Sequence, residues 1–470
     1  MLRQAQHERR LIWLAIAALT LFGLVQRLLA ARGALWLDEA WSATFAQEAV
    51  TPAGVIWRIN HDNNHILNTL WLQLVGPDAP PMLQRALSIA TGTATIPLAA
   101  TFGFRRSSAS GLLAALAFAI SPMLVTYGSE ARGYAPMVAA FVAMLVLVDH
   151  WLDHDDARPA PAIGLAILAL LGTLAQVMMI APLFAIVGWA GATLWRRHGF
   201  ERAFRLTAAA LVPALIGAAS VLLTMVCAAR AAPHGFTIGS YYPFHLADWA
   251  GGISNAVAWT LGFGAAGHWA AAAGLAAAGL LLVTQRNDAR APFYVVMIIA
   301  FPLAFALFRI GNVATPRFYL AAMAALLLLA ADAFGAVIER RRPLWAIAAL
   351  VALFVIGTVR LDAALIANRR GDPAVAIAAM RAAAPNGAAL MLPDRRLVPV
   401  FDQAARDARY RLRIAGTSCS PAPFLILDND HPVADPSGLH LCCGLYHLIA
   451  SRRVVGLSGT NWWLYRREGP

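Results

Sequence analysis

Long apolar blocks separated by short polar segments make up most of the first 360 residues of the chain. A helix that crosses a bilayer needs roughly 20 mostly apolar residues, and several of these blocks reach that length. The pattern predicts an all-α polytopic membrane protein with about eleven transmembrane helices. The eleven blocks lie at residues 11–31, 82–104, 109–126, 134–152, 160–175, 177–195, 206–228, 266–284, 292–308, 316–334 and 344–360.

The blocks at 160–175 and 177–195 are separated only by Ala175 and Gln176, so a single tilted helix is the alternative there. That alternative leaves ten spans and reverses the orientation of everything that follows. The arginines decide between the two, because cytoplasmic loops carry an excess of positive charge. With eleven spans and a cytoplasmic N-terminus, fifteen arginines lie in cytoplasmic segments and seven at the opposite face. We therefore expect the N-terminus inside and the C-terminus outside.

Three segments are longer than a connection between spans requires. Residues 32–81 form the first extracytoplasmic loop, and residues 229–265 form a second outward segment, a lid or an interface. The apolar residues of the first loop recur at the spacing of amphipathic helices, which we expect along the membrane surface. They are Trp41, Phe45, Val50, Leu67, Leu70, Trp71 and Leu74.

The third segment, residues 361–470, has ordinary charge and is punctuated by Pro and Gly. It predicts a small extracytoplasmic α/β domain that follows a transmembrane domain at residues 1–360. Its expected elements are a helix at 374–383, strands at 388–392, 424–427 and 462–465, and a helical stretch that begins at Cys442 and Cys443.

Composition agrees with the membrane prediction and removes some function classes. Charged residues make up 13% of the chain, against about 25% in soluble proteins. The net charge of +12 could suggest nucleic-acid binding, but many arginines lie in short loops between apolar blocks, which indicates topology. The chain has no lysine, so chemistry through a Schiff base or a lysine nucleophile is excluded.

Two groups of polar residues in the first outer loop are candidates for chemistry. Asp38 and Glu39 follow the first span directly, where adjacent carboxylates can act as general base, metal ligand or, for Asp38, merely as a helix cap. The second group is the polar run at residues 60–65, with His61, Asn64 and His65. Such residues bind sugars when aromatic rings lie nearby, and the alternative is a solvated loop tip.

Two further groups lie at later connections on the same face. The turn at 127–134 contains Glu130, Arg132 and Tyr134, more chemistry than a short connection needs. Its alternative is a Glu130–Arg132 pair that only neutralises itself. At the outer end of the tenth span, Arg317 and Tyr319 follow Pro316, and a guanidinium is a preferred partner of phosphate. The alternative is an arginine that reaches lipid headgroups. All four groups converge on one membrane face.

The segments at 36–40, 64–65, 129–134 and 316–319 together resemble the GT-C superfamily of membrane glycosyltransferases. The chain is similar to bacterial proteins related to protein O-mannosyltransferases and to the aminoarabinose transferase of lipid A. The resemblance covers roughly residues 10–335. It departs from the family where His65 is followed by Ile66 and Leu67 instead of two prolines, and where Gln176 replaces a histidine.

This resemblance implies an enzyme of the bacterial inner membrane whose active site faces the periplasm. It would transfer a hexose or pentose from a polyprenyl-phosphate donor to a lipid, glycan or protein acceptor, with Asp38 as the catalytic carboxylate and Glu39 beside it. Glu130, Arg132, Tyr134, Arg317 and Tyr319 would bind the donor phosphate, and His61, Asn64 and His65 the sugar or acceptor. No cofactor is required, and a divalent metal at Asp38 and Glu39 stays open.

The rival from another class is a transporter or flippase of lipid-linked sugars. Transporters place ionisable residues near the bilayer midplane and contain internal repeats. In this chain the span interiors look nearly free of charge and the two halves show no repeat. An assembly factor without catalysis would not need the convergent polar groups.

The cysteines permit one structural prediction. Cys227 lies in an apolar block, and Cys419, Cys442 and Cys443 lie near the C-terminus, without the spacing of a zinc site. On the oxidising face, Cys419 can form a disulfide with Cys442 or Cys443. The alternative is three small buried thiols.

Overall fold

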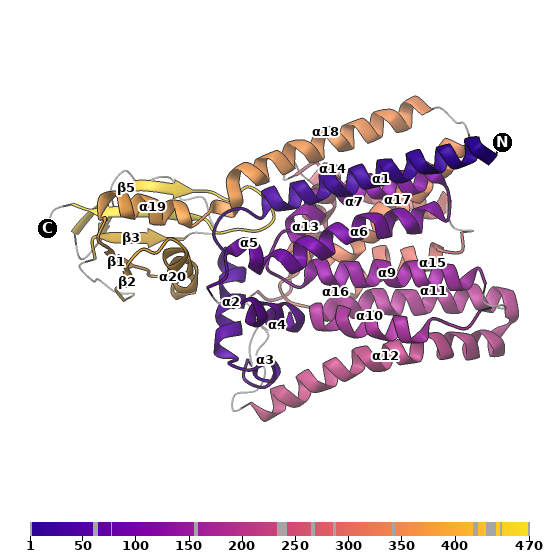
Figure 1. Cartoon of the computed structure of the whole chain (residues 1–470), viewed down its shortest axis with the longest axis horizontal. Coiled ribbons are helices and arrows are strands. Elements are labelled where there is room, and N and C mark those ends of the chain that lie inside the picture. Colours follow the sequence, from indigo (N-terminus) through magenta and orange to yellow (C-terminus); the bar gives the residue numbers. More distant parts are fainter. Residues whose placement is uncertain are drawn as a thin grey trace.

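The computed structural model describes residues 2–59, 64–76, 78–154, 158–232, 242–264, 268–284, 288–340, 344–416, 422–428, 439–441 and 444–468. These residues form a bundle of mostly antiparallel helices with a small sheet domain at one end (Figure 1). The N-terminus of α1 (Leu2–Ala30) lies at the other end of the bundle (Figure 1). This arrangement suits an odd number of membrane crossings, and the side on which each end lies stays a prediction.

Each of the eleven predicted blocks falls on a helix or on a pair of consecutive helices. After α1 these are α6 (Ala86–Phe104), α7 (Ser108–Ile120), α9 (Tyr134–Leu152), α10 (Ala162–Ala175), α11 (Ile180–His198), α12 (Phe200–Ala231), α14 (His268–Thr284), α15 (Ala291–Val295) with α16 (Phe301–Leu307), α17 (Leu320–Glu339) and α18 (Leu344–Asn368).

Seven helices of the described residues are long and apolar enough to cross a membrane: those at 9–30, 86–104, 134–152, 177–198, 200–231, 316–339 and 344–371. The remaining blocks form shorter apolar helices. One reason is a local break: α7 ends before Ser121, and Pro122 begins the short helix α8 (Pro122–Tyr127). The multi-pass character of the chain is therefore evident, and the count of eleven spans stays a prediction.

Two separate helices occupy the region 160–198, as the arginine distribution favours. The first, α10, ends at Ala175, and Gln176 has an extended backbone with φ −161° and ψ 126°. A short 3₁₀ turn, η1 (Val177–Met179), leads into α11. Pro182 lies in the first turn of α11, where its missing N–H has no partner to lose. The break at Gln176 also places this side chain next to the candidate site described below.

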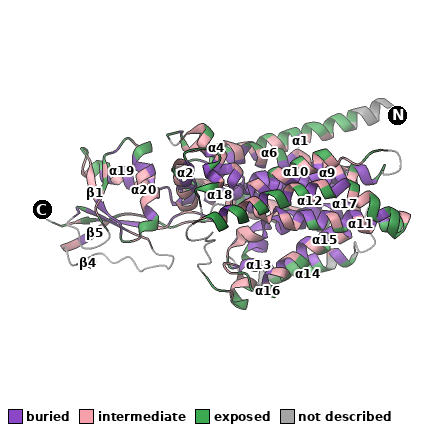
Figure 2. Ribbon diagram, turned by 90° about the horizontal axis from the view of Figure 1, so that it is seen from below, coloured by how far each residue is buried: buried purple, intermediate pink, exposed green. Residues whose placement is uncertain are grey.

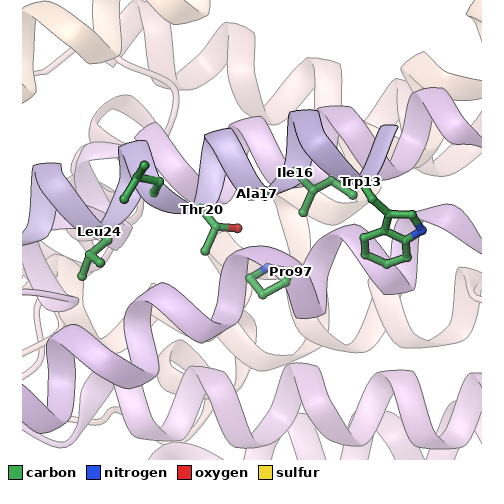
Figure 3. Close-up of a pocket in the computed structure, with 7 residues that line it drawn as sticks. Trp13, Ile16, Ala17, Thr20, Leu24 and Pro97 are labelled. Carbon is green, nitrogen blue, oxygen red and sulfur yellow. The ribbon is translucent and has the colours of Figure 1, made fainter. Parts of the chain in front are cut away.

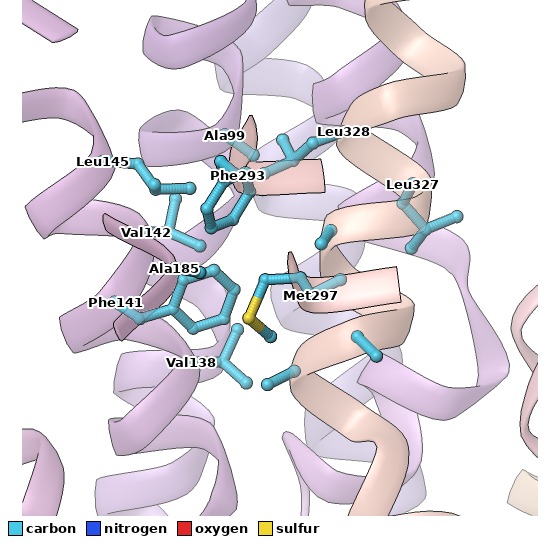
Figure 4. Packing of buried hydrophobic residues seen from close by; sticks show 14 of the residues in the cluster. Ala99, Val138, Phe141, Val142, Leu145, Ala185, Phe293, Met297, Leu327 and Leu328 are labelled. Atoms are coloured by element: carbon cyan, nitrogen blue, oxygen red, sulfur yellow. The ribbon is translucent and has the colours of Figure 1, made fainter. Parts of the chain in front are cut away.

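The bundle core is formed by apolar side chains from helices that are distant in sequence. Figure 4 shows Val138, Phe141, Val142 and Leu145 of α9 packed against Phe293 and Met297, with Ala99, Ala185, Leu327 and Leu328 around them. Buried residues are concentrated in these inner helices, whereas much of α1 and α12 is exposed (Figure 2). Exposed apolar side chains on the outer helices suit contact with lipid rather than water.

The outward surface of α1 illustrates this lipid-facing character. Trp13, Ile16, Thr20 and Leu24 of α1 lie opposite Pro97 of α6 and border a shallow apolar groove of about 420 Å³ (Figure 3). Near the C-terminal end of α1, one side chain that points into the bundle is charged. Arg27 is fully buried and donates to the carbonyl oxygens of Gly23, Phe118 and Ala119. The expectation that span interiors are nearly free of charge is therefore only partly right.

Short helices cover the end of the bundle nearest the sheet domain. The first outer loop contains α2 (Leu37–Glu48), α3 (Gly54–Trp57), α4 (Ile66–Val75) and α5 (Pro81–Gln84), and the second contains α13 (Leu246–Thr260). The predicted helices in the first loop exist, and their position along a membrane surface stays a prediction. Val50 lies beyond α2 and is exposed, and Leu74 of α4 is 79% exposed. The buried residues of α4 include Asn68 and Thr69, because this helix packs on a polar site.

The C-terminal domain contains one mixed sheet and two helices, α19 (Ala374–Ala383) and α20 (Val398–Asp407). The strand order is β2-β1-β3-β6-β5-β4, parallel for β2-β1-β3 and antiparallel for the rest. The strands are β1 (Ala388–Met391), β2 (Leu412–Ile414), β3 (Phe424–Leu427), β4 (Leu439–Leu441), β5 (Gly444–Arg452) and β6 (Trp462–Arg467).

The predicted helix at 374–383 and the three predicted strands are present in this domain. The expectation of a helical stretch after Cys443 is wrong, because residues 444–452 form β5. Pairing with β4 and β6 on both sides decides the conformation there, and the local sequence alone does not carry that information. The predicted disulfide between Cys419 and Cys442 or Cys443 lies outside the described residues.

Candidate active site

The site begins at the start of α2, directly after the first span. Trp36 is the N-cap residue of α2, and the carboxylate of Glu39 accepts a hydrogen bond from the Trp36 backbone N–H at 3.2 Å. This is the return half of a capping box. Asp38 lies in the first turn but does not cap the helix, so the simple capping alternative does not describe it. Its side chain is instead directed toward two arginines.

Glu39 belongs to a closed ion pair with Arg85, which precedes α6. The Arg85 guanidinium donates to Glu39 Oε1 at 2.8 Å and to Oε2 at 2.5 Å, and both side chains are at most 1% exposed. Arg85 also donates to the carbonyl oxygens of Ala31, Gly33 and Ala34. Burial opposes ionisation of Glu39, but Arg85 outweighs it and holds the pKa of this carboxyl below its ordinary value. Glu39 therefore serves the framework of the site, and the geometry does not support the catalytic role expected beside Asp38.

Asp38 is the open carboxylate of the pair. Arg317 donates a hydrogen bond to Asp38 Oδ2, and Arg132 Nη1 lies 3.5 Å from the same oxygen. The exposed fractions are 21% for Asp38, 12% for Arg132 and 27% for Arg317, so all three remain accessible. Burial alone would raise the pKa of Asp38, but the charges of Arg317 and Arg132 outweigh burial. The net effect is a pKa below the ordinary Asp value, so the carboxyl is ionised at neutral pH. Two guanidinium groups and one carboxylate thus meet at an accessible point.

The turn that carries Arg132 connects α8 to α9 and is held from several sides. The Ala131 N–H donates to Glu39 Oε1 at 2.7 Å, and Asn68 donates to the Ala131 carbonyl oxygen at 2.7 Å. Ser88 donates to the Arg132 carbonyl oxygen at 2.7 Å. At Gly133 an added Cβ would lie 1.7 Å from the Ala175 carbonyl oxygen, so only glycine permits this close approach.

Aromatic and polar side chains line the space beside these charges. The ring of Tyr134 lies 4.8 Å from that of His65 and 5.2 Å from that of Tyr127. Arg132 lies 5.8 Å from the centre of the Tyr134 ring, at the outer limit of a cation–π contact. Burial, and then the charge of Arg132, hold the pKa of His65 well below its ordinary value, so the imidazole is neutral. Its Nδ1 lies 3.2 Å from the Ala175 carbonyl oxygen, which orients the ring.

Several buried polar atoms at this point have no hydrogen-bond partner among the described residues. They are the Tyr127 hydroxyl, His65 Nε2, Asn64 Oδ1 and both amide atoms of Gln176. A buried polar atom without a partner costs about 1–3 kcal/mol, so a concentration of them in one place indicates a binding function. Such groups match the alternating donors and acceptors of a sugar.

An apolar groove of about 960 Å³ begins at the same place. Asn64, Gln176 and Phe318 line one part of it, and they are chain neighbours of His65, Ala175 and Arg317. The remaining lining comes from η1, α11, α12, the α15–α16 region and residues 310–312, and includes the exposed residues Phe184, Val226 and Phe308. The groove therefore extends from chain neighbours of the site residues to exposed apolar side chains on the outside of the bundle.

Two predicted donor-binding residues face elsewhere. Glu130 is fully buried, accepts a hydrogen bond from Ser458 of the C-terminal domain, and lies 3.5 Å from Arg370. Tyr319, in the 3₁₀ turn η3 (Pro316–Tyr319), donates to the Val313 carbonyl oxygen at 3.0 Å and is 0% exposed. The hydrogen bonds of both side chains are thus to groups other than Asp38, and their expected role at the donor stays a prediction. His61 lies outside the described residues.

Other residues of the site were not among the predicted ones. Tyr127 and Gln176 were visible as an aromatic in the polar turn and as a helix-breaking polar residue, respectively. Arg85, Asn68 and Ser88 carried no local signal, because each acts through a partner more than 40 positions away. Within the described ranges, no three His, Cys, Asp or Glu side chains gather as a metal site would require.

No protein-family model matches this chain, and the search of curated proteins finds no significant match.

Proposed function

We propose that this protein is a glycosyltransferase of the bacterial inner membrane that uses a polyprenyl-phosphate sugar as donor. The observation that carries the proposal is the position of Asp38 between Arg132 and Arg317, at the end of an apolar groove of about 960 Å³. The four sequence segments that resemble the GT-C superfamily support it independently.

The donor has two chemically different parts, and the site offers a match to each. The polyprenyl chain is apolar and would occupy the groove between α11, α12 and α16, which is open to the lipid side. The phosphate would lie at Arg132 and Arg317, because guanidinium groups bind phosphate oxygens through paired, charge-assisted hydrogen bonds. Phe318 lines the groove and follows Arg317 directly, which places the change from apolar to charged lining at one point.

The sugar would lie beside the phosphate, where the unpartnered polar atoms meet the end of the groove. Tyr127, His65, Asn64 and Gln176 can together donate and accept hydrogen bonds, and Tyr134 offers a ring face. The neutral state of His65 allows it to use one ring nitrogen as donor or acceptor without adding a third positive charge. These groups give the pocket its capacity to select among sugars.

In the transfer step, an acceptor hydroxyl oxygen forms a bond to the anomeric carbon while the bond from that carbon to the phosphate oxygen breaks. The electron pair of the broken bond stays on the lipid phosphate, where Arg132 and Arg317 stabilise the added charge. The hydroxyl proton passes to Asp38, which is ionised at neutral pH as a general base must be. A phosphate that takes hydrogen bonds from the two arginines would leave Asp38 more basic than it is with both arginines to itself.

The acceptor is a lipid, a glycan or a protein on the extracytoplasmic side, toward which the C-terminal domain would project. The rival function, transport of the lipid-linked sugar, shares the ligand but not the chemistry. An assay in detergent solution distinguishes the two functions, because transport needs two compartments and transfer does not.

The test is donor turnover by the purified protein in detergent solution. A lipid extract that contains polyprenyl-phosphate sugars is incubated with the protein and with membrane-derived acceptors, and free polyprenyl phosphate is measured by mass spectrometry. A transferase releases polyprenyl phosphate and labels an acceptor, whereas a transporter consumes no donor in detergent. Donor that stays intact with acceptor fractions from the native membrane would overturn the proposal.

A further inference from the structure

The C-terminal domain reaches into the candidate site through one short segment, Ser458–Thr460, which precedes β6. The Ser458 hydroxyl donates to Glu130, two residues before Arg132. The Thr460 hydroxyl accepts a hydrogen bond from the Leu37 backbone N–H at 3.1 Å, one residue before Asp38. Ser458 and Thr460 are 7% and 3% exposed. This three-residue segment therefore contacts both parts of the chain that carry the charged residues: the start of α2, with Asp38, and the turn before α9, with Arg132.

The backbone of this segment is itself held against the bundle. The Thr460 N–H donates to the Arg370 carbonyl oxygen at 3.1 Å. Gly459 has a φ of +148°, and a Cβ added to it would lie 2.6 Å from that same oxygen. Only glycine fits here, because both the conformation and the contact exclude a side chain.

Arg370 also connects the C-terminal domain to the bundle, through its side chain. Its guanidinium is 1% exposed and donates to the carbonyl oxygens of Ala30 at 2.5 Å and Thr126 at 3.1 Å, and to the Ser129 hydroxyl at 2.7 Å. The end of the first span, the end of α8 and the turn before α9 thus share one cation from the C-terminal half of the chain. A domain that merely packed on the bundle would not need buried charge at the contact, since burying charge is costly.

We propose that Ser458, Thr460 and Arg370 are positioning residues of the site, which hold the start of α2 and the turn before α9 at the separation that lets Asp38 and Arg132 act on one phosphate. The proposal rests on the proposed function for its consequence in catalysis, but not for the mechanical coupling itself. The C-terminal domain is then a working part of the site.

Glu130 makes the stability of this contact depend on pH. Burial raises the pKa of Glu130 to about 7, although Arg370, Ser458 and Arg132 each lower it, and the other titratable groups around it are Glu39, Arg85 and Tyr127. A carboxyl whose pKa is higher in the folded than in the unfolded protein binds its proton more tightly in the folded protein. The folded state is therefore most stabilised when Glu130 is protonated, and this contribution is lost as the pH rises from the ordinary Glu range through about 7.

A matched pair of variants at one position tests the mechanical coupling. Thr460→Val keeps the shape and removes the acceptor, and Thr460→Ser keeps the hydroxyl. Hydrogen–deuterium exchange of the full-length protein is followed for peptides that cover residues 37–42 and 128–133. We expect Thr460→Val to speed exchange in both peptides by about tenfold and Thr460→Ser to behave like the wild type. Unchanged exchange in both peptides, or acceleration confined to the C-terminal domain, overturns the coupling.

Ser458→Ala is the second variant. The Ser458 side chain contacts only the turn before α9, through Glu130. We expect it to speed exchange at 128–133 and, through the shared segment, to lower kcat about tenfold with little change in the KM for donor. A purely structural role would lower the amount of folded protein without that split between kcat and KM. Exchange judges the coupling even if the wild type shows no transfer, so the two proposals fail separately.

Thermal unfolding against pH tests the role of Glu130. The wild-type midpoint should fall between pH 6 and pH 8 relative to that of Glu130→Gln, whose amide cannot ionise. An identical pH dependence in the two proteins contradicts the assignment.

Discussion

Two clusters of buried charge lie at opposite ends of the bundle, and they are built differently. At the end away from the C-terminal domain, Arg290 is 1% exposed and binds Asp149 and Asp332 through both carboxylates. Tyr294 donates to Asp332 at 2.7 Å, and Phe102 contributes a carbonyl acceptor and a ring 3.6 Å from the guanidinium. Every described side-chain polar atom of Arg290, Asp149 and Asp332 has a partner.

The cluster at the other end holds Asp38, Arg132 and Arg317, and it is incomplete by comparison. Its charges are 12–27% exposed, and Arg132 Nε has no partner among the described residues. Unpartnered atoms of Tyr127, His65 and Gln176 lie around it. Both clusters consist of Arg and Asp side chains beside apolar helices, so residue type alone does not separate a structural cluster from a functional one. The two clusters differ in whether each polar atom has a hydrogen-bond partner and in how far the side chains are exposed.

Loss of the Asp38 charge should have the largest effect of any single change. Asp38→Asn preserves shape and removes basicity, and we expect transfer to fall by about 10²–10⁴-fold, the usual size of general-base effects. Transfer is measured as polyprenyl phosphate released per folded protein. More than about a tenth of wild-type turnover would exclude Asp38 as the principal base.

The closed cluster should respond in stability instead. Asp332→Ala leaves Arg290 with one carboxylate in a buried setting, which typically costs about 3–5 kcal/mol. Denaturant unfolding in detergent measures this, with Asp153→Asn as the control. Asp153 is 57% exposed, so its pair with Arg105 should contribute less than about 1 kcal/mol. A large loss of turnover per folded molecule in Asp332→Ala would erase the distinction between the two ends.

Blocking the groove should have a smaller and more selective effect. Ala304→Trp places a large ring in the groove, and we expect the KM for a long-chain donor to rise about tenfold with kcat nearly unchanged. A donor with a short lipid should be unaffected. Leu350→Trp, in a separate apolar groove lined by α7, α14, α17 and α18, is the matched control. Equal effects on long and short donors would remove the groove from the lipid path.

The sequence predicts the helical blocks and much of the sheet domain because both follow from local patterns. Runs of apolar residues identify the spans, and α19, β1, β3 and β6 start where the apolar pattern and the turn residues indicate. The helix α20 and the strands β2, β4 and β5 are not predicted, and the conformation of β5 depends on pairing with its two neighbours. The count of long helices falls short of the count of blocks partly because a proline such as Pro122 shortens a helix without interrupting its hydrophobicity.

The sequence predicts the charged residues of the candidate site but not the residues that hold them in place. Asp38, Arg132 and Arg317 stand out because charge is rare beside apolar blocks. The roles of Glu39 and Glu130 cannot be read in the same way, since each is decided by a partner distant in sequence, Arg85 and Ser458 respectively. Sequence locates the polar groups on one face, and only the fold shows which of them meet.

The most direct test of the account is binding of undecaprenyl phosphate to two arginine variants, measured by native mass spectrometry of the purified protein. Arg317 belongs to the open cluster, and Arg106, which pairs with Asp288 at the other end, has a similar exposed fraction of 33%. We predict that Arg317→Ala lowers binding at least tenfold and that Arg106→Ala binds like the wild type. Unchanged binding in Arg317→Ala, or an equal loss in both variants, would contradict the assignment of the Asp38 cluster as the site for a lipid phosphate.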